Sequence, residues 1–152
     1  MSLICFQVIS SSRIGDLSWL YPGCSFEACA SRWLPGATRI AVLTKGGQGA
    51  TAITRSLEIS VPAVEAQVVD TVGAGDAFNA GILSGLRQRG FLDKKKLQRI
   101  SDEGLRFSME FAAQVTAITV SRAGADTPWR HELQSQQSND VVEHSGQWNI
   151  TE

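Results

Sequence analysis

The segment that most constrains this chain is residues 70–76, DTVGAGD, which stands between a short apolar segment and a helix-like stretch. Its two glycines, on either side of one alanine, let the backbone turn tightly and keep side chains away from any group that approaches it. Residues 76–89 have helical character and end at Gly90, the residue type most common just beyond a helix C-terminus. The pattern predicts a tight turn that opens directly into a helix.

Such a turn has a chemical consequence. The first turn of a helix leaves several backbone N–H groups without partners and carries the positive end of the helix dipole, so it forms a pocket suited to a phosphate. Asp76 places a carboxylate beside this pocket. It could act as a general base toward an attacking hydroxyl, or it could only stabilise the helix dipole by about 0.3–1 kcal/mol. The residues alone leave both interpretations open.

Short apolar segments upstream predict a sheet. Residues 4–9, 40–44, 50–54 and 57–61 have the length and residue types of strands. Residues 25–34 predict a helix that Ser25 caps, with Phe26, Cys29, Ala30 and Trp33 on one face. Strands and helices that alternate in this way indicate an α/β fold.

A second glycine-rich segment, residues 44–50 (TKGGQGA), lies between two of these strands. A dinucleotide-binding glycine loop must lead from a strand into a helix, whereas this one leads into another strand. The context therefore favours a strand–turn–strand connection and argues against a dinucleotide oxidoreductase. A hairpin alone would also explain these glycines.

The C-terminal part predicts one further helical region and a tail. Asp93 can cap a helix in which apolar residues recur at helical spacing, namely Leu97, Ile100, Leu105, Met109, Ala112 and Ala113. Residues 117–120 fit either the end of this helix or a strand. Residues 134–152 are polar and aperiodic, which predicts a poorly ordered tail after a single domain over residues 1–133.

Composition excludes several classes of partner. Over 152 residues the formal net charge is −1, which gives no basis for recognising nucleic acid or a membrane surface by bulk charge. No apolar run has membrane-spanning length. The three cysteines fit a cytoplasmic protein with reduced thiols, and the spacing of Cys24 and Cys29 does not fit a zinc site.

The DTVGAGD segment, with the AFNAG that follows it, closely resembles the second signature of PfkB-type carbohydrate kinases. Residues 44–50 are similar to the nucleotide-contacting segment of that family, and residues 120–125 (VSRAGA) to its monovalent-cation loop. Residues 16–20 (DLSWL) resemble the fructokinase-like and 2-keto-3-deoxygluconate-kinase-like members. The resemblance implies a ribokinase-like three-layer α/β/α fold with a mostly parallel sheet, of which this chain has the C-terminal part and no lid.

The resemblance also implies roles for individual residues. Asp76 would deprotonate a sugar hydroxyl, and the backbone N–H groups of residues 73–76 (Gly73, Ala74, Gly75, Asp76) would stabilise the transferring phosphoryl group. Nucleotide contacts are implied for Thr44, Lys45, Gly46, Gly47, Gln48, Gly49 and Ala113. A potassium-like ion is implied at Asp70, Val72, Thr119, Arg122 and Gly124, mostly on backbone carbonyls, and Mg²⁺ would arrive with ATP. From the residues alone, Ala113 is predicted to be a core residue and Arg122 a surface charge.

The chain matches only the latter half of the family pattern. We find nothing similar to the family's first signature, its sugar-binding N-terminal part or its Asn-x-x-Glu segment. The expected partners are a sugar and ATP, and a homodimer is compatible with the sequence. Two functions follow: an ATP-dependent sugar kinase, or a kinase-derived chain without catalysis that binds nucleotide or a partner.

Overall fold

The computed structural model describes residues 7–10 and 21–133. Its sheet has four strands in the order β1 (Gln7–Ser10), β2 (Ala41–Thr44), β3 (Ala50–Ile53) and β4 (Glu58–Val61). The apolar segments 40–44, 50–54 and 57–61 are therefore strands, as predicted. β1 overlaps the first predicted strand at residues 7–9 and extends one residue further, to Ser10, while residues 4–6 fall outside the described ranges.

The pairing of the strands differs from the mostly parallel sheet that the resemblance implied. In the described part, β1 and β2 pair in parallel, whereas β2 with β3 and β3 with β4 pair antiparallel. The reason is the length of the connections. Few residues separate β2, β3 and β4, and connections this short join only antiparallel neighbours, because a parallel pair needs a long crossover.

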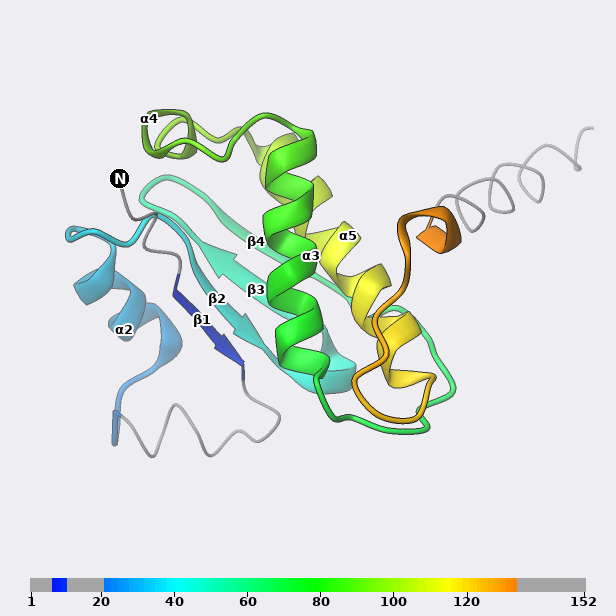
Figure 1. The fold of residues 1–152 in the computed structure, drawn as a ribbon. Helices are drawn as coiled ribbons and strands as arrows, with labels where there is room; N and C mark the ends of the chain where they lie inside the picture. The colour runs from blue at the N-terminus through cyan, green and yellow to red at the C-terminus, as the bar shows by residue number, and fades with distance from the viewer. Residues whose placement is uncertain (1–6, 11–20, 134–152) are drawn as a thin grey trace, which may run out of the picture.

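Helices cover both faces of the sheet, which makes the predicted three layers (Figure 1). Helix α2 (Phe26–Trp33) packs Phe26, Cys29 and Ala30 against Ala41 on one face. Ser25 caps it as predicted, its Oγ accepting a hydrogen bond of 3.2 Å from the N–H of Ala28. Helices α3 (Ala74–Gln88) and α5 (Asp102–Val120) cover the other face.

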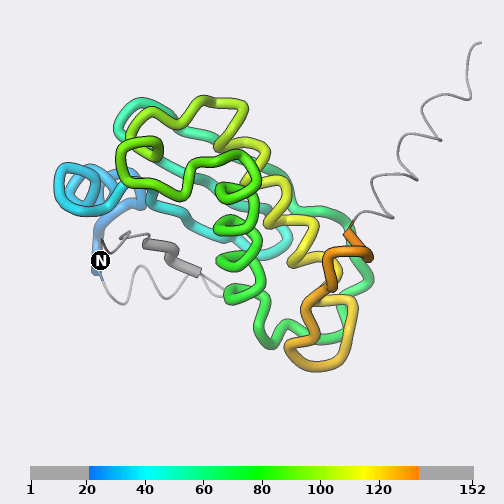
Figure 2. The backbone as a smooth tube through the Cα atoms, turned by 45° about the horizontal axis from the view of Figure 1, so that its top comes forward, coloured from blue at the N-terminus to red at the C-terminus, as the bar shows by residue number. Residues whose placement is uncertain are grey.

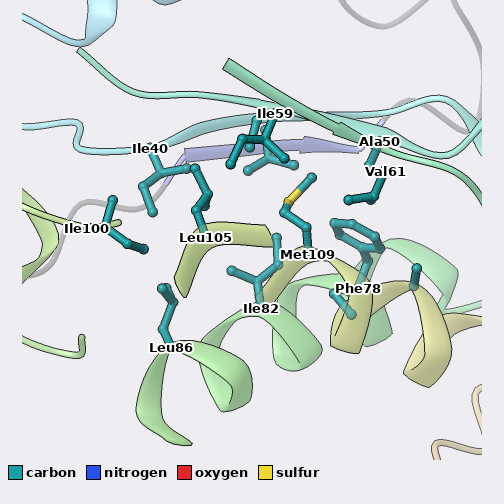
Figure 3. Packing of buried hydrophobic residues seen from close by; sticks show 14 of the residues in the cluster. Ile40, Ala50, Ile59, Val61, Phe78, Ile82, Leu86, Ile100, Leu105 and Met109 are labelled. Carbon is teal, nitrogen blue, oxygen red and sulfur yellow. The ribbon is translucent and has the colours of Figure 1, made fainter. Parts of the chain in front are cut away.

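The main core lies between the sheet and the α3–α5 pair (Figure 3). Alternate residues in and just before β2 divide between the two faces, with Ile40 and Val42 toward α3 and α5 and Ala41 toward α2. Ile82 of α3 and Met109 of α5 are fully buried beneath the strands. This packing fixes the N-terminus of α3 at one end of the sheet.

α3 and α5 pack closely at two glycines of α3. A Cβ placed on Gly81 would lie 2.6 Å from Cα of Ala112, and one on Gly85 would lie 2.7 Å from Cα of Ser108. Only glycine fits at these two crossings. The helices run side by side over much of their length (Figures 1 and 2).

Two helical regions differ from the sequence prediction, and one open alternative is decided. α3 begins at Ala74 rather than at residue 76, and its end matches the prediction, with Gly90 at a φ of +74° just beyond it. The region predicted as one helix is two: α4 (Lys94–Leu97), capped by Asp93, and α5, capped by Ser101. Ser101 interrupts the pattern because its side chain accepts from the N–H of Gly104 and so starts a new helix. Residues 117–120 are the end of α5, not a strand.

Candidate active site

A cleft of about 1020 Å³ opens where β2 ends and α3 begins. Its walls come from four parts of the chain: the glycine turn after β2, the extended segment 63–68, the N-terminal turn of α3 and one face of α5. Among the predicted site residues, it is lined by Thr44, Gly46, Gly47, Gly49, Gly73, Ala74, Gly75, Asp76 and Ala113. Segments far apart in the sequence therefore meet around one cavity.

The floor of the cleft at α3 is the turn that the sequence singled out. Gly73 is the N-cap residue with a φ of +78°, a left-handed conformation that favours glycine. A Cβ on Gly73 would also lie 2.7 Å from Cβ of Ala125, so the loop after α5 leaves no room for a side chain. Gly75 and Asp76 occupy the first helical turn, where N–H groups lack intrahelical partners. The turn therefore has the backbone geometry predicted for an anion pocket, and anion binding there stays a prediction.

One of the predicted backbone donors already has a hydrogen-bond partner within the protein. The N–H of Ala74 donates to the carbonyl of Thr71 at 3.2 Å within the turn itself. Gly75 and Asp76, in the first turn of α3, remain as backbone donors beside the cleft. The Asp76 side chain is exposed and borders the same cleft, so it is accessible to a substrate there.

Asp70 holds this turn against the loop that follows α5. Its Oδ1 accepts from the N–H of Val72 at 3.0 Å, and its Oδ2 accepts from the N–H of Gly124 at 2.9 Å. These bonds, with that of Val72 the stronger influence, hold the pKa of the Asp70 carboxyl below its ordinary value. The N–H groups of Val69 and Asp70 also donate to the carbonyl of Val120, at 2.8 and 3.2 Å. The two loops thus form one braced unit.

The predicted cation residues all lie in or beside this unit, although the polar side chains of Asp70, Thr119 and Arg122 have other partners. The hydroxyl of Thr119 is buried and donates to the carbonyl of Val115 at 2.9 Å. The Arg122 guanidinium pairs with Glu132 and, at 3.4 Å, with Asp126. Its contact with Glu132 raises the pKa of Arg122 and lowers that of Glu132. Because a guanidinium has no acceptor, any cation contact of Arg122 would use its backbone oxygen.

The glycine turn after β2 forms the opposite wall. Residues Gly46–Gln48 make one 3₁₀ turn, and β3 follows, so the predicted strand–turn–strand connection is confirmed. Gly49 has a φ of +88°, and a Cβ there would lie 2.1 Å from the carbonyl oxygen of Val61. Only glycine can occupy this position.

Two residues predicted to contact nucleotide do not line the cleft. Lys45 donates instead from Nζ to Oγ1 of Thr51 at 3.0 Å, and Thr51 in turn shares a hydrogen bond of 2.9 Å with Ser60. Gln48 is exposed and also lies outside the cleft lining. The glycines of this turn, rather than its long side chains, border the cavity.

Several lining residues were not predicted. The segment 63–68 forms a whole wall, yet its sequence has no periodicity or motif that would have indicated this. Thr116 and Ala117 of α5 were detectable in principle, because they follow Ala113 at helical spacing. Asn79 of α3 also lines the cleft, three residues after Asp76.

Other predicted features have limited bearing on the site. Within residues 7–10 and 21–133, no group of three or more His, Cys, Asp or Glu side chains could hold a metal ion. Cys24 and Cys29 are free thiols, and burial raises the pKa of Cys29. No helix in the described part is long and apolar enough to span a membrane. Residues 16–20 and the tail 134–152 lie outside the described residues.

Comparison with known proteins agrees with the geometry. Residues 27–132 match the family described as pfkB family carbohydrate kinase. A fructokinase from Rhizobium leguminosarum bv. trifolii is 38% identical over 91 residues, which cover 60% of this chain and 28% of that protein. The chain therefore corresponds to less than a third of this relative's length.

Solved structures show the same fold. A fructokinase from Xylella fastidiosa with bound ATP superposes with a TM-score of 0.76 and 26% identity over 90% of this chain and 43% of that one. A ribokinase from Thermotoga maritima gives a TM-score of 0.67 and 22% identity over 88% and 42% of the two chains. The described part of the chain is thus a portion of the ribokinase-like α/β fold.

Proposed function

Since the chain belongs to the pfkB carbohydrate kinase family, we propose that it takes part in ATP-dependent phosphorylation of a sugar hydroxyl, in a fructokinase-like manner. The observation that carries this proposal is the cleft in which an exposed carboxylate, Asp76, adjoins the backbone donors of Gly75 and Asp76. Phosphoryl transfer requires little more from a protein than positioned reactants and stabilised charge.

In the proposed reaction, Asp76 takes the proton from the sugar hydroxyl as that oxygen attacks the terminal phosphorus of ATP. The bond from this phosphorus to the bridging oxygen of ADP breaks, and ADP leaves with the electron pair. The first-turn N–H groups of α3 stabilise the negative charge on the transferring group. General-base catalysis of this kind contributes about 10²–10⁴-fold in rate.

The nucleotide fits between the glycine turn and α5. Gly46, Gly47 and Gly49 leave the turn without side chains toward the cleft, so a phosphate chain can approach the backbone. Ala113 provides a small, apolar surface on the facing helix, suited to a base. We assign Lys45 and Gln48 no side-chain role toward the nucleotide.

Two cations accompany this assignment. Mg²⁺ would come with ATP, since the described residues hold no cluster of acidic side chains and Mg²⁺ commonly binds through substrate phosphates. A potassium-like ion fits at the braced loops, where Asp70 supplies carboxylate oxygens with lone pairs beyond those its N–H contacts use. Such an ion would stabilise the loop that carries Gly73. Location in the cytoplasm remains a prediction.

The proposal is tested with the purified chain, by measuring ADP release from ATP with fructose, ribose or 2-keto-3-deoxygluconate as acceptor. Asp76→Asn should lower kcat at least about 100-fold and change the Kd for ATP by no more than about threefold. Asp102→Asn, at an exposed position at the start of α5, is the matched control and should retain turnover. An active chain whose Asp76→Asn variant keeps near-normal turnover would contradict the proposal.

A second function has its own support. The chain corresponds to under a third of its curated relative, so a chain that binds nucleotide without catalysis is the alternative. Calorimetric binding of ATP with no phosphoryl transfer to any sugar of the panel would favour it. Absence of both ATP binding and turnover would exclude both functions for this chain.

A further inference from the structure

Asn79 has a buried acceptor without a donor. Its Oδ1 is shielded from solvent and has no hydrogen-bond partner within the described part of the chain, and no other side-chain polar atom there shares this condition. Burying a carbonyl without a hydrogen bond destabilises a protein, so such atoms are uncommon and call for a physical reason. Asn79 also lines the cleft, and a rotation of its amide toward the cavity would let a ligand there supply the missing donor.

The position of Asn79 on α3 relates it to Asp76. The two residues are three apart on one helix, so their Cβ atoms are neighbours at about 5–6 Å. Both line the same cleft, as does Phe78, which also packs into the main core. A ligand group held at Asp76 would therefore come within reach of the amide of Asn79.

The chemistry of the amide oxygen selects the ligand group. An acceptor cannot pair with the ionised oxygens of a phosphate, which are themselves acceptors. It pairs well with a hydroxyl. The amide oxygen of Asn79, next to the Asp76 carboxylate, therefore favours a substrate that carries a second hydroxyl close to the one that reacts.

We propose that Asn79 binds the sugar, its Oδ1 accepting a hydrogen bond from a hydroxyl one or two carbons from the hydroxyl that Asp76 deprotonates. The inference rests on the proposed kinase function. It assigns Asn79 a part in substrate selection: polyhydroxylated acceptors are favoured over analogues that lack the neighbouring hydroxyl.

The test compares the wild-type chain with Asn79→Leu, which has similar volume and no acceptor. For the best sugar of the panel, kcat/KM is measured with that sugar and with its monodeoxy analogues, and the Kd for ATP is measured separately. The wild-type chain should prefer the full sugar over one monodeoxy analogue by about tenfold, and Asn79→Leu should lose this preference. Ser84→Ala, at an exposed position elsewhere on α3, is the control that should retain it.

A structural readout keeps the two proposals separate. Removing an unpaired buried carbonyl should raise the Tm of the ligand-free Asn79→Leu chain, and this measurement needs no activity. A lower or unchanged Tm overturns the inference, since the oxygen would then already be satisfied. If the wild-type chain has no turnover, the kinase proposal fails for this chain. The role of Asn79 is then decided by how far added sugar raises the Tm of the wild-type and Asn79→Leu chains.

In that case, a sugar-induced rise in Tm that is smaller in Asn79→Leu than in wild type supports the inference. Equal rises in both, including none in either, overturn it. Weaker ATP binding in Asn79→Leu with unchanged sugar preference also overturns it, because the amide would then contact nucleotide.

Discussion

Gly81→Ala tests the close packing of α3 against α5. The added Cβ would lie 2.6 Å from Cα and 3.0 Å from Cβ of Ala112, whereas carbon atoms pack favourably at about 3.5–4.0 Å. The helices would have to separate by roughly 1 Å at this crossing. Ala112 offers no flexible side chain that could move aside, so the backbone of α5 must shift.

Two opposing effects set the magnitude. Overpacking of a tight core costs about 1–3 kcal/mol. Alanine in a helix interior is more favourable than glycine by about 0.5–1 kcal/mol. Packing is the larger effect, and the net loss in the free energy of unfolding should be about 1 kcal/mol. For a domain of this size, that corresponds to a fall in Tm of about 4 °C.

The assay is urea and thermal unfolding followed by circular dichroism. Gly47→Ala is the matched control, because a Cβ there meets no atom within 4 Å and the backbone has no positive φ. Its free energy of unfolding should change by less than about 0.5 kcal/mol. If Gly81→Ala proves as stable as wild type or more stable, helix propensity outweighs packing and the inferred closeness of α3 and α5 is wrong.

Three further predictions concern the turns and caps around the cleft. Gly49→Ala should destabilise the chain by about 2 kcal/mol or more, because a Cβ would lie 2.1 Å from the Val61 carbonyl oxygen at a φ of +88°; a urea midpoint equal to that of wild type would refute this. Ser101→Ala should lower the free energy of unfolding by about 1 kcal/mol through loss of the 3.1 Å bond to the N–H of Gly104, and an unchanged midpoint would show that α5 needs no cap. The lowered pKa of Asp70 stabilises the fold above the ordinary aspartate pKa of about 3.9, and this contribution is lost as pH falls through the still lower folded value. The Tm difference between wild type and Asp70→Asn should therefore shrink from pH 6 to pH 3, and a constant difference would contradict the role of the carboxylate.

Local patterns in the sequence predicted the elements that depend on neighbouring residues. The glycines of residues 70–76 and the helix after them were readable because only certain residues tolerate a left-handed turn before a helix. The hairpin around Gly49 and the caps at Ser25 and Asp93 follow from equally local chemistry. The interruption at Ser101 was missed, since a serine within an apolar helical pattern does not by itself show that a new helix starts.

The sheet pairing and the cleft needed the tertiary structure. Apolar strand segments look alike whether their neighbours run parallel or antiparallel, so the resemblance suggested a pairing that the short connections do not permit. Asp70 and Gly124 lie 54 residues apart, and no periodicity links them; the resemblance placed both at one ion site, but only the structure shows their direct hydrogen bond. The wall made by residues 63–68 likewise carries no motif.

The sequence by itself therefore determined the glycine turn before α3, the carboxylate at Asp76 and the family, because each depends on a few consecutive residues. Only the tertiary structure decided which distant segments close the cleft, that Lys45 lies outside it, and that Asn79 presents an unpaired acceptor next to Asp76. The physical reason is that burial and hydrogen-bond satisfaction belong to the packed molecule. A side chain's partners are set by all the elements that pack around it, and these are brought together only by folding.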